Sequence, residues 1–216
     1  MERVLDFILS GLAVIVLSPL LVLIACILKA SGEGEILYIQ PRVGKNGSLF
    51  GLLKFATMLK DSPNIGSGLH TIKKDPRVLP MGHFLRKTKI NELPQLFNIL
   101  LGSMSIIGPR PLVDKTFEPY SDLVKNNIYK VKPGLSGIGS IVFRDEEKIL
   151  TDSEMSPHEC YRNIILPYKG ELEIWYQDHC SLFLDFQLIF LTAWAIFFPK
   201  SLIHEKWYKD LPKQSF

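Results

Sequence analysis

The chain has 216 residues, enough for one ordinary domain with a membrane element added. Its charged fraction of 22% excludes a disordered chain and an all-membrane protein, and its net charge of +3 is too small to indicate nucleic acid. The three cysteines, Cys26, Cys160 and Cys180, lack metal or redox spacing and favour free thiols in a reducing compartment.

The first apolar segment, residues 4–28, reads "VLDFILSGLAVIVLSPLLVLIACIL" and carries one charge, Asp6. The uncharged part from Phe7 to Leu28 is about as long as a bilayer is thick, and it is longer than the apolar region of a signal peptide. We therefore expect this segment to lie in lipid.

Pro19 interrupts this segment near its middle. Proline removes a backbone donor and pushes Ser18 away from helical geometry, while the Ser18 hydroxyl can serve a carbonyl that proline leaves unbonded. Two outcomes follow: a kinked single span, or a helix that breaks and leaves by the face it entered. Arg3 and Lys29 are balanced and do not decide, so an ordinary bent anchor is the default from physics alone.

Residues 36–58, "ILYIQPRVGKNGSLFGLLKFATM", predict a two-stranded hairpin around the turn "GKNG", with Arg42 and Lys54 on either side of the turn. A polar stretch follows at 60–77, "KDSPNIGSGLHTIKKDPR". Its glycines, prolines and serines predict a surface loop, either simply solvated or able to close over a ligand.

Residues 90–100, "INELPQLFNIL", predict a helix capped by Asn91, with Glu92 in its first turn. Its buried stripe is expected to comprise Leu93, Leu96, Phe97 and Leu100. Three cations precede the helix N-terminus, where backbone N–H groups favour an anion: Arg86, Lys87 and Lys89. Glu92 is therefore either chemistry or only the start of a helix.

Arg110 lies between Pro109 and Pro111, which hold it in an extended stretch where its guanidinium can meet a phosphate, although a purely structural role is equally open. The glycine-punctuated segment 131–141 is weak evidence for phosphate binding. One acid, several fixed cations and lipid contact together suggest a phosphate-bearing substrate handled at a membrane surface.

The order of these motifs resembles that of the bacterial sugar transferases, the small monotopic phosphoglycosyl transferases. The resemblance rests on the Ser18-Pro19 break and on "KFATM" (54–58), "DPR" (75–77), "LRKT" (85–88), "NELPQLFN" (91–98), "MSIIGPRPL" (104–112) and "KPGLSG" (132–137). A weaker match is "SLFLDFQLI" at 181–189.

The resemblance implies an α/β fold in two parts: a re-entrant membrane helix over 1–31 and a catalytic domain over 32–216 at the cytoplasmic face of the bacterial inner membrane. Such enzymes transfer a sugar phosphate from a UDP-sugar to a polyprenyl (undecaprenyl) phosphate and release UMP, the first step of surface-glycan assembly. Mg²⁺ is the implied cofactor, and the lipid bilayer and other glycan-assembly glycosyltransferases are implied partners.

The family's Asp-Glu pair falls on Asn91 and Glu92. In the family the Asp attacks the sugar-bearing phosphate and the Glu helps to hold magnesium. The resemblance assigns Arg86 a role beside this pair. It also implies that three further cations bind the substrate phosphates: Lys54, Arg77 and Arg110.

The chain departs from the family pattern at Asn91, at Ser103 where the family has an acid, and at Ala56 where a basic residue is usual. An amide cannot act as the attacking carboxylate. Three readings stay open: an active enzyme that uses Glu92 or direct attack by the lipid phosphate, a silent homologue that binds lipid phosphate or nucleotide sugar and modulates a partner, and an engineered substitution that traps a complex.

The C-terminal third contains an acidic stretch, 144–156, interpreted as a solvated surface rather than a metal site. A second apolar segment, 182–198, is short for a span and predicts an interfacial helix, with a core helix as the alternative. Lysines and aromatics in the tail, including Trp207 and Tyr208, suit an anionic membrane surface.

Overall fold

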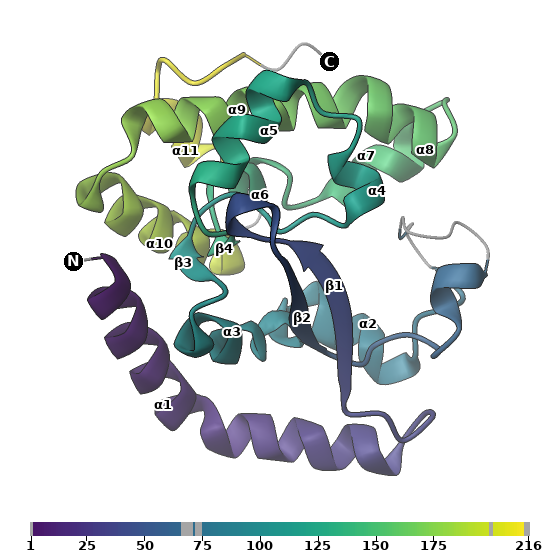
Figure 1. Ribbon diagram of the computed structural model, residues 1–216. Coiled ribbons are helices and arrows are strands. Elements are labelled where there is room, and N and C mark those ends of the chain that lie inside the picture. The colour runs from purple at the N-terminus through teal and green to yellow at the C-terminus, as the bar shows by residue number, and fades with distance from the viewer. Residues whose placement is uncertain (1, 66–70, 72–74, 199–200, 214–216) are drawn as a thin grey trace.

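A computed structural model describes residues 2–65, 71, 75–198 and 201–213. Its first element, α1 (Glu2–Ala30), stays helical across Pro19, so Ser18 is not expelled from the helix as the sequence suggested. The Ser18 hydroxyl donates to the Ile15 carbonyl at 2.8 Å, the carbonyl that Pro19 cannot bond. This confirms the predicted partner, and α1 bends near its middle (Figure 1).

The N-terminal arm of α1 is bonded to the rest of the chain by two charged side chains. Arg3 donates to the carbonyls of Ile99 and Leu100, at 2.5 and 2.9 Å. The Asp6 carboxylate is buried and accepts from the Ser105 hydroxyl at 2.6 Å and from the backbone N–H of the following residue at 3.0 Å.

The C-terminal arm of α1 packs on the same body of the protein. Its buried residues Leu21, Ile24 and Leu28 form an apolar cluster with Phe55 and Leu85. Among the described helices α1 is the one long and apolar enough to cross a membrane, and most of its surface is not covered by protein. The uncovered side chains include Phe7, Leu12, Ile15, Val16 and Leu23.

The predicted hairpin is confirmed. Strands β1 (Leu37–Val43) and β2 (Leu49–Phe55) pair antiparallel, with Val43 opposite Leu49 at the closed end. Asn46 has a φ of 57°, a left-handed conformation that asparagine tolerates in turns. The hairpin places β2 against the helix that follows Glu92.

Short helices follow the hairpin. α2 (Pro80–Lys87) leads through a 3₁₀ turn at Ile90–Glu92 to α3 (Gln95–Leu101). The predicted cap at Asn91 is wrong, because the chain makes this separate turn and α3 begins only after Pro94. Phe97 is also not part of a buried stripe: it is exposed, while Leu96 and Ile99 are buried.

A second sheet consists of the parallel pair β3 (Ser105–Ile107) and β4 (Gly134–Ser136). The main core surrounds it and is built largely on α9 (Leu166–His179), whose Leu172 is fully buried. The other elements of this part are α4 (Asp114–Phe117), α5 (Asp122–Lys130), α6 (Ile138–Val142), α7 (Glu146–Asp152), α8 (Pro157–Cys160) and a π-helical turn, Tyr161–Ile165. This mixture confirms the α/β class.

The second apolar segment forms α10 (Leu182–Phe197), which buries Leu188 and Leu191 in the core and exposes Phe183 and Phe197 on its other face. The short α11 (Ile203–Trp207) follows, and Trp207 stacks on an exposed phenylalanine of α10. The sequence placed Trp207 and Tyr208 together at a membrane surface, but only Trp207 is exposed, because Tyr208 is buried against Trp175 of α9 at a centroid distance of 5.1 Å.

Candidate functional site

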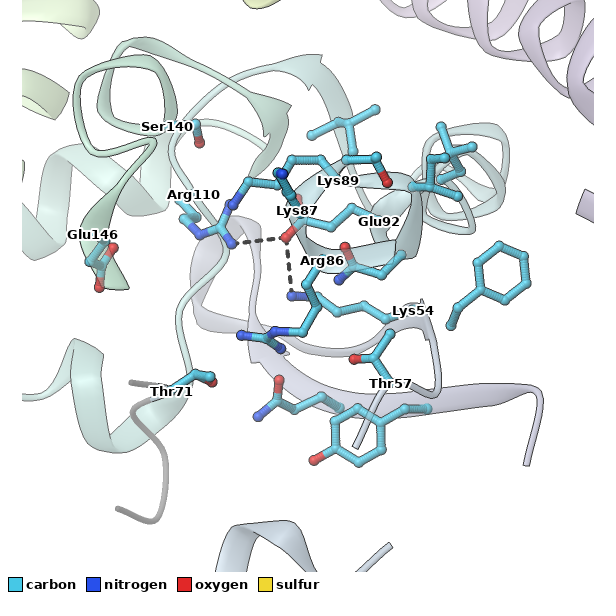
Figure 2. A pocket seen from close by; sticks show the side chains of 18 of the residues that line it. Lys54, Thr57, Thr71, Arg86, Lys87, Lys89, Glu92, Arg110, Ser140 and Glu146 are labelled. Atoms are coloured by element: carbon cyan, nitrogen blue, oxygen red, sulfur yellow. Dashed lines mark hydrogen bonds and ion pairs between the residues drawn. The ribbon is translucent and has the colours of Figure 1, made fainter. Parts of the chain in front are cut away.

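Three side chains from distant parts of the chain meet in one ion cluster (Figure 2). The Glu92 Oε1 atom lies 3.1 Å from Arg110 Nη2 and 3.5 Å from Lys54 Nζ. The Glu92 side chain is 13% exposed, whereas that of Arg110 is 35% exposed. The structure brings Glu92 and Arg110 together, and Arg110 retains an accessible side.

The Arg110 segment is fixed from both flanks. The Gly134 N–H donates to the Pro109 carbonyl at 2.8 Å, and Arg42 Nη1 donates to the Pro111 carbonyl at 2.9 Å. Only glycine fits at position 134, since a Cβ there would lie 2.2 Å from a backbone nitrogen of the facing segment. The guanidinium is therefore presented from a rigid backbone.

The cluster has unusual protonation properties. Burial raises the pKa of Glu92, but the charges of Arg110, Lys54 and Lys89 outweigh burial and hold this pKa well below its usual range. Burial lowers the pKa of Lys54 to about 7, against the opposing effect of Glu92. Glu92 is thus ionised at neutral pH, while Lys54 titrates in the physiological range.

Further cations border the cluster. Arg86, Lys87 and Lys89 line the same cavity as Glu92 (Figure 2). Lys89 adopts a left-handed conformation with a φ of 62°, which turns the chain between α2 and the 3₁₀ turn. One carboxylate is therefore surrounded by several positive charges, a setting that favours an anion such as phosphate.

Asn91 lies beside Glu92 and also lines the cavity. Its side chain is buried, and its Oδ1 atom has no hydrogen-bond partner within the described part of the chain. A buried amide oxygen without a donor is costly, which suggests that a ligand satisfies it.

Arg77 is not brought into the cluster and does not line the cavity. It is 2% exposed, and its Nη2 and Nε atoms bond the two Asp75 oxygens at 2.6 and 2.9 Å. Its Nη1 atom donates to the carbonyls of Ser62 and Ile65. These contacts place Arg77 as a structural clamp and do not support the expected phosphate-binding role.

The two other departures from the family pattern differ in position. Ala56 is buried and lines the cavity. Ser103 does not line it, and its hydroxyl bonds the Asn98 carbonyl at 3.1 Å. Residue 103 therefore lies outside the cavity lining. The rest of the predicted loop, 66–70 and 72–74, lies outside the described residues.

The cavity has a volume of about 1900 Å³ and extends well beyond the ion cluster. One wall contains Leu17 and Leu20, which flank the Ser18-Pro19 bend of α1. Another contains Ile189 and Ile196 of α10. A charged centre with apolar walls that include α1 can accommodate an amphiphilic phosphate.

Some residues around the cavity were not predicted. Glu146 was interpreted as part of a solvated acidic surface, but its side chain is only 26% exposed and forms an ion pair with Lys169. Ser140 and Lys169 line the cavity without any functional expectation from the sequence. Lys169 has the helical spacing of the buried residues Ile165 and Leu172, so it lies on the same face of the helical stretch. A charged residue on an otherwise apolar face is the sequence feature that could have identified it.

The oxygen atoms around Glu92 bear on whether the expected Mg²⁺ fits this site. No group of three or more His, Cys, Asp or Glu side chains suited to a metal occurs in the described ranges. Magnesium, however, is commonly held by one or two protein oxygens together with substrate phosphates and water. Glu92 and the unpartnered Asn91 Oδ1 fit that shared mode of binding.

This fold and site combine a carboxylate bordered by several cations with a cavity that is also lined by the apolar helix α1. The sequence pattern of the family described as "Bacterial sugar transferase" matches residues 1–199. The chain belongs to this family.

Similar proteins include the UDP-glucose:undecaprenyl-phosphate glucose-1-phosphate transferase of Klebsiella pneumoniae, 34% identical over 93% of this chain and 41% of that protein. The exopolysaccharide production protein ExoY of Sinorhizobium fredii is 34% identical over 90% of this chain and 84% of its own length. The undecaprenyl-phosphate galactose phosphotransferase of Salmonella typhimurium is 30% identical over 89% of this chain and 40% of that protein. The chain thus spans about two fifths of the first and third of these relatives.

Proposed function

We propose that this protein transfers a sugar phosphate from a UDP-sugar to undecaprenyl phosphate and releases UMP. The observation that carries the proposal is the Lys54–Glu92–Arg110 cluster, placed in a cavity whose apolar wall is the bend of α1. The activities for which these relatives are named support the same reaction and do not favour a silent binding protein.

In the proposed reaction, an oxygen of the lipid phosphate attacks the β-phosphorus of the UDP-sugar. The new P–O bond forms as the bond from this phosphorus to the bridging oxygen breaks, and UMP leaves with that oxygen. Arg110 and Lys54 stabilise the charge on the transferred phosphate. Anionic phosphate also raises the Lys54 pKa, which keeps the lysine protonated when substrate is bound.

Glu92 holds the two cations in place before substrate arrives. Because its Oε1 atom is shared by Lys54 and Arg110, the geometry favours Glu92 as a positioning group over Glu92 as the nucleophile. Mg²⁺ is part of the proposal: Glu92 and Asn91 Oδ1 would hold it together with the diphosphate. When bound, the ion would neutralise phosphate charge.

We also propose that α1 is re-entrant and that the protein lies on the cytoplasmic face of the inner membrane. Both arms of α1 contact one body of protein, Arg3 and Asp6 at one end and Leu28 at the other. A straight span would separate these ends by the thickness of the bilayer. Contact with the glycosyltransferases that extend the lipid-linked sugar belongs to the same proposal.

The test is UMP release by the purified full chain with UDP-sugars, Mg²⁺ and undecaprenyl phosphate. We expect release above that of Glu92→Gln, and Asn91→Asp to increase it by supplying a carboxylate beside Glu92. If neither wild type nor Glu92→Gln releases UMP above a control without protein, the enzymatic proposal is wrong. A gain by Asn91→Asp in that case would show an intact scaffold that lacks only its nucleophile.

A further inference from the structure

A second polar cluster lies in the same cavity beyond Arg110. It consists of Ser140 on α6, Glu146 on α7 and Lys169 on α9. The Lys169 ammonium donates to Glu146 Oε2 at 2.6 Å. Figure 2 shows Ser140 and Glu146 on the Arg110 side of the Glu92 cluster, with Thr57 on the other side.

The lysine of this cluster is held in a fixed position. Its Nζ atom lies 5.1 Å from the ring centroid of Phe143 and 5.2 Å from that of Tyr161, within cation–π range. A buried lysine–carboxylate pair contributes little net stability, because desolvation of the two charges opposes their attraction. Ligand recognition is a better reason for placing such a pair on a cavity wall.

Ser140 adds an unsatisfied hydroxyl. Its Oγ atom is buried and has no hydrogen-bond partner among the residues that the structure describes. An ammonium donor, a carboxylate acceptor and a hydroxyl that can do both are the groups that bind a polyhydroxylated ligand. A phosphate would instead be repelled by Glu146.

Arg110 connects the two clusters. Its guanidinium bonds Glu92, while its backbone N–H is bonded to the carboxylate of Glu173, one turn after Lys169 on α9. In a UDP-sugar the sugar is attached directly to the phosphate that Arg110 would hold. In addition, α7 and α9 lie across the molecule from α1 (Figure 1), so this end of the cavity is remote from the lipid-facing helix.

We propose that Ser140, Glu146 and Lys169 bind the hydroxyl groups of the donor's sugar and determine which sugar is accepted. The inference rests on the proposed function, because it takes the bound ligand to be a UDP-sugar. It adds a subsite that discriminates among sugars while the nucleotide lies elsewhere in the cavity.

The test is calorimetric binding of UMP, UDP-glucose, UDP-galactose and UDP-N-acetylglucosamine to the full chain. We expect Glu146→Gln to weaken the preferred UDP-sugar by about tenfold or more, and Ser140→Ala by about threefold to tenfold. UMP binding should change by less than about twofold, since UMP carries no sugar at this position. The ratio of kcat/KM between donors should shift in parallel.

Two exposed residues on the same helices provide matched controls: Glu171→Gln on α9 and Lys148→Met on α7. Neither should alter sugar preference. Ser140→Ala removes a single hydroxyl, so it remains informative if Glu146→Gln reduces folding. Equal losses for UMP and for every UDP-sugar, or no change in any of them, would overturn the inference.

Failure of the two proposals is distinguishable. If the wild type discriminates among UDP-sugars in binding and Ser140→Ala removes that preference, the subsite stands even when no UMP is released. If UMP is released but sugar preference is unchanged in both variants, the proposed function stands and the subsite is wrong.

Discussion

Arg77 and Arg110 occupy similar sequence contexts but differ in their surroundings: Arg77 is buried in the fold, and Arg110 lines the cavity. Each follows a proline, in "DPR" and in "GPR". The residue two positions before Arg77 is Asp75, whose carboxylate bonds the guanidinium twice. The corresponding residue before Arg110 is Gly108, which has no side chain, so Arg110 reaches outward to Glu92 and the cavity. The residue two positions earlier accounts for the difference, because Asp75 holds Arg77 within the fold while Arg110 remains directed toward the cavity.

The largest expected effect separates these roles in activity. Arg110→Ala should lower UMP release by about 10²- to 10³-fold, because a fixed charge on the transferred phosphate is lost. Its melting temperature should fall less than that of Arg77→Ala, since Lys54 still pairs with Glu92 and the Arg110 guanidinium is partly exposed. Arg162→Ala, an exposed arginine in the π-helical turn, is the matched control. Retained activity in Arg110→Ala would remove Arg110 from the site.

Arg77→Ala should show the reverse pattern. Removing one partner of a buried ion pair leaves Asp75 uncompensated, at a cost of about 3–5 kcal/mol in the free energy of unfolding. Chemical denaturation measures this loss, and activity per folded molecule should be preserved. Normal stability combined with lost activity would return Arg77 to the list of phosphate-binding residues.

The pH dependence sharpens the contrast at Lys54, the other cation on Glu92. Because the Lys54 pKa is about 7, kcat/KM should fall as pH rises through this value, and Lys54→Arg should move the fall to higher pH. The unfolded chain binds more protons at this position between pH 7 and the ordinary lysine pKa of 10.5, so Lys54 makes stability rise with pH across that window. A pH profile identical in Lys54→Arg contradicts the assignment.

The smallest expected effect concerns an exposed ion pair. Lys60 Nζ lies 3.3 Å from Glu35 Oε1, with both side chains largely in solvent. Lys60→Ala should change the free energy of unfolding by less than about 0.5 kcal/mol, because water and salt screen such pairs. A loss comparable to that of Arg77→Ala would show that burial is not what distinguishes the two pairs.

Features governed by local covalent chemistry were predictable from the sequence. The missing N–H of Pro19 and the neighbouring Ser18 hydroxyl predicted the repair of one carbonyl, and the turn residues around Asn46 predicted the hairpin. The convergence of Glu92 with Lys54 and Arg110 was expected only through the family resemblance, because these residues are far apart along the chain.

The incorrect predictions concern residues whose roles depend on contacts with parts of the chain that are distant in sequence or on the exact start of a helix. Asn91 is a good capping residue, yet it does not cap α3. The left-handed Lys89 leads into a separate 3₁₀ turn, and α3 begins only after Pro94. Arg77 matched the expected motif, but its own Asp75 satisfied it. Glu146 belongs to an acidic run, and only the packing of α7 beside α9 shows that it meets Lys169.

The bend of α1 bears on which leaflet of the bilayer would hold the lipid-linked product. In the proposed re-entrant arrangement both arms of α1 contact the same part of the protein, so this helix forms no passage through the bilayer. The lipid-linked product would therefore remain in the leaflet that supplied the acceptor.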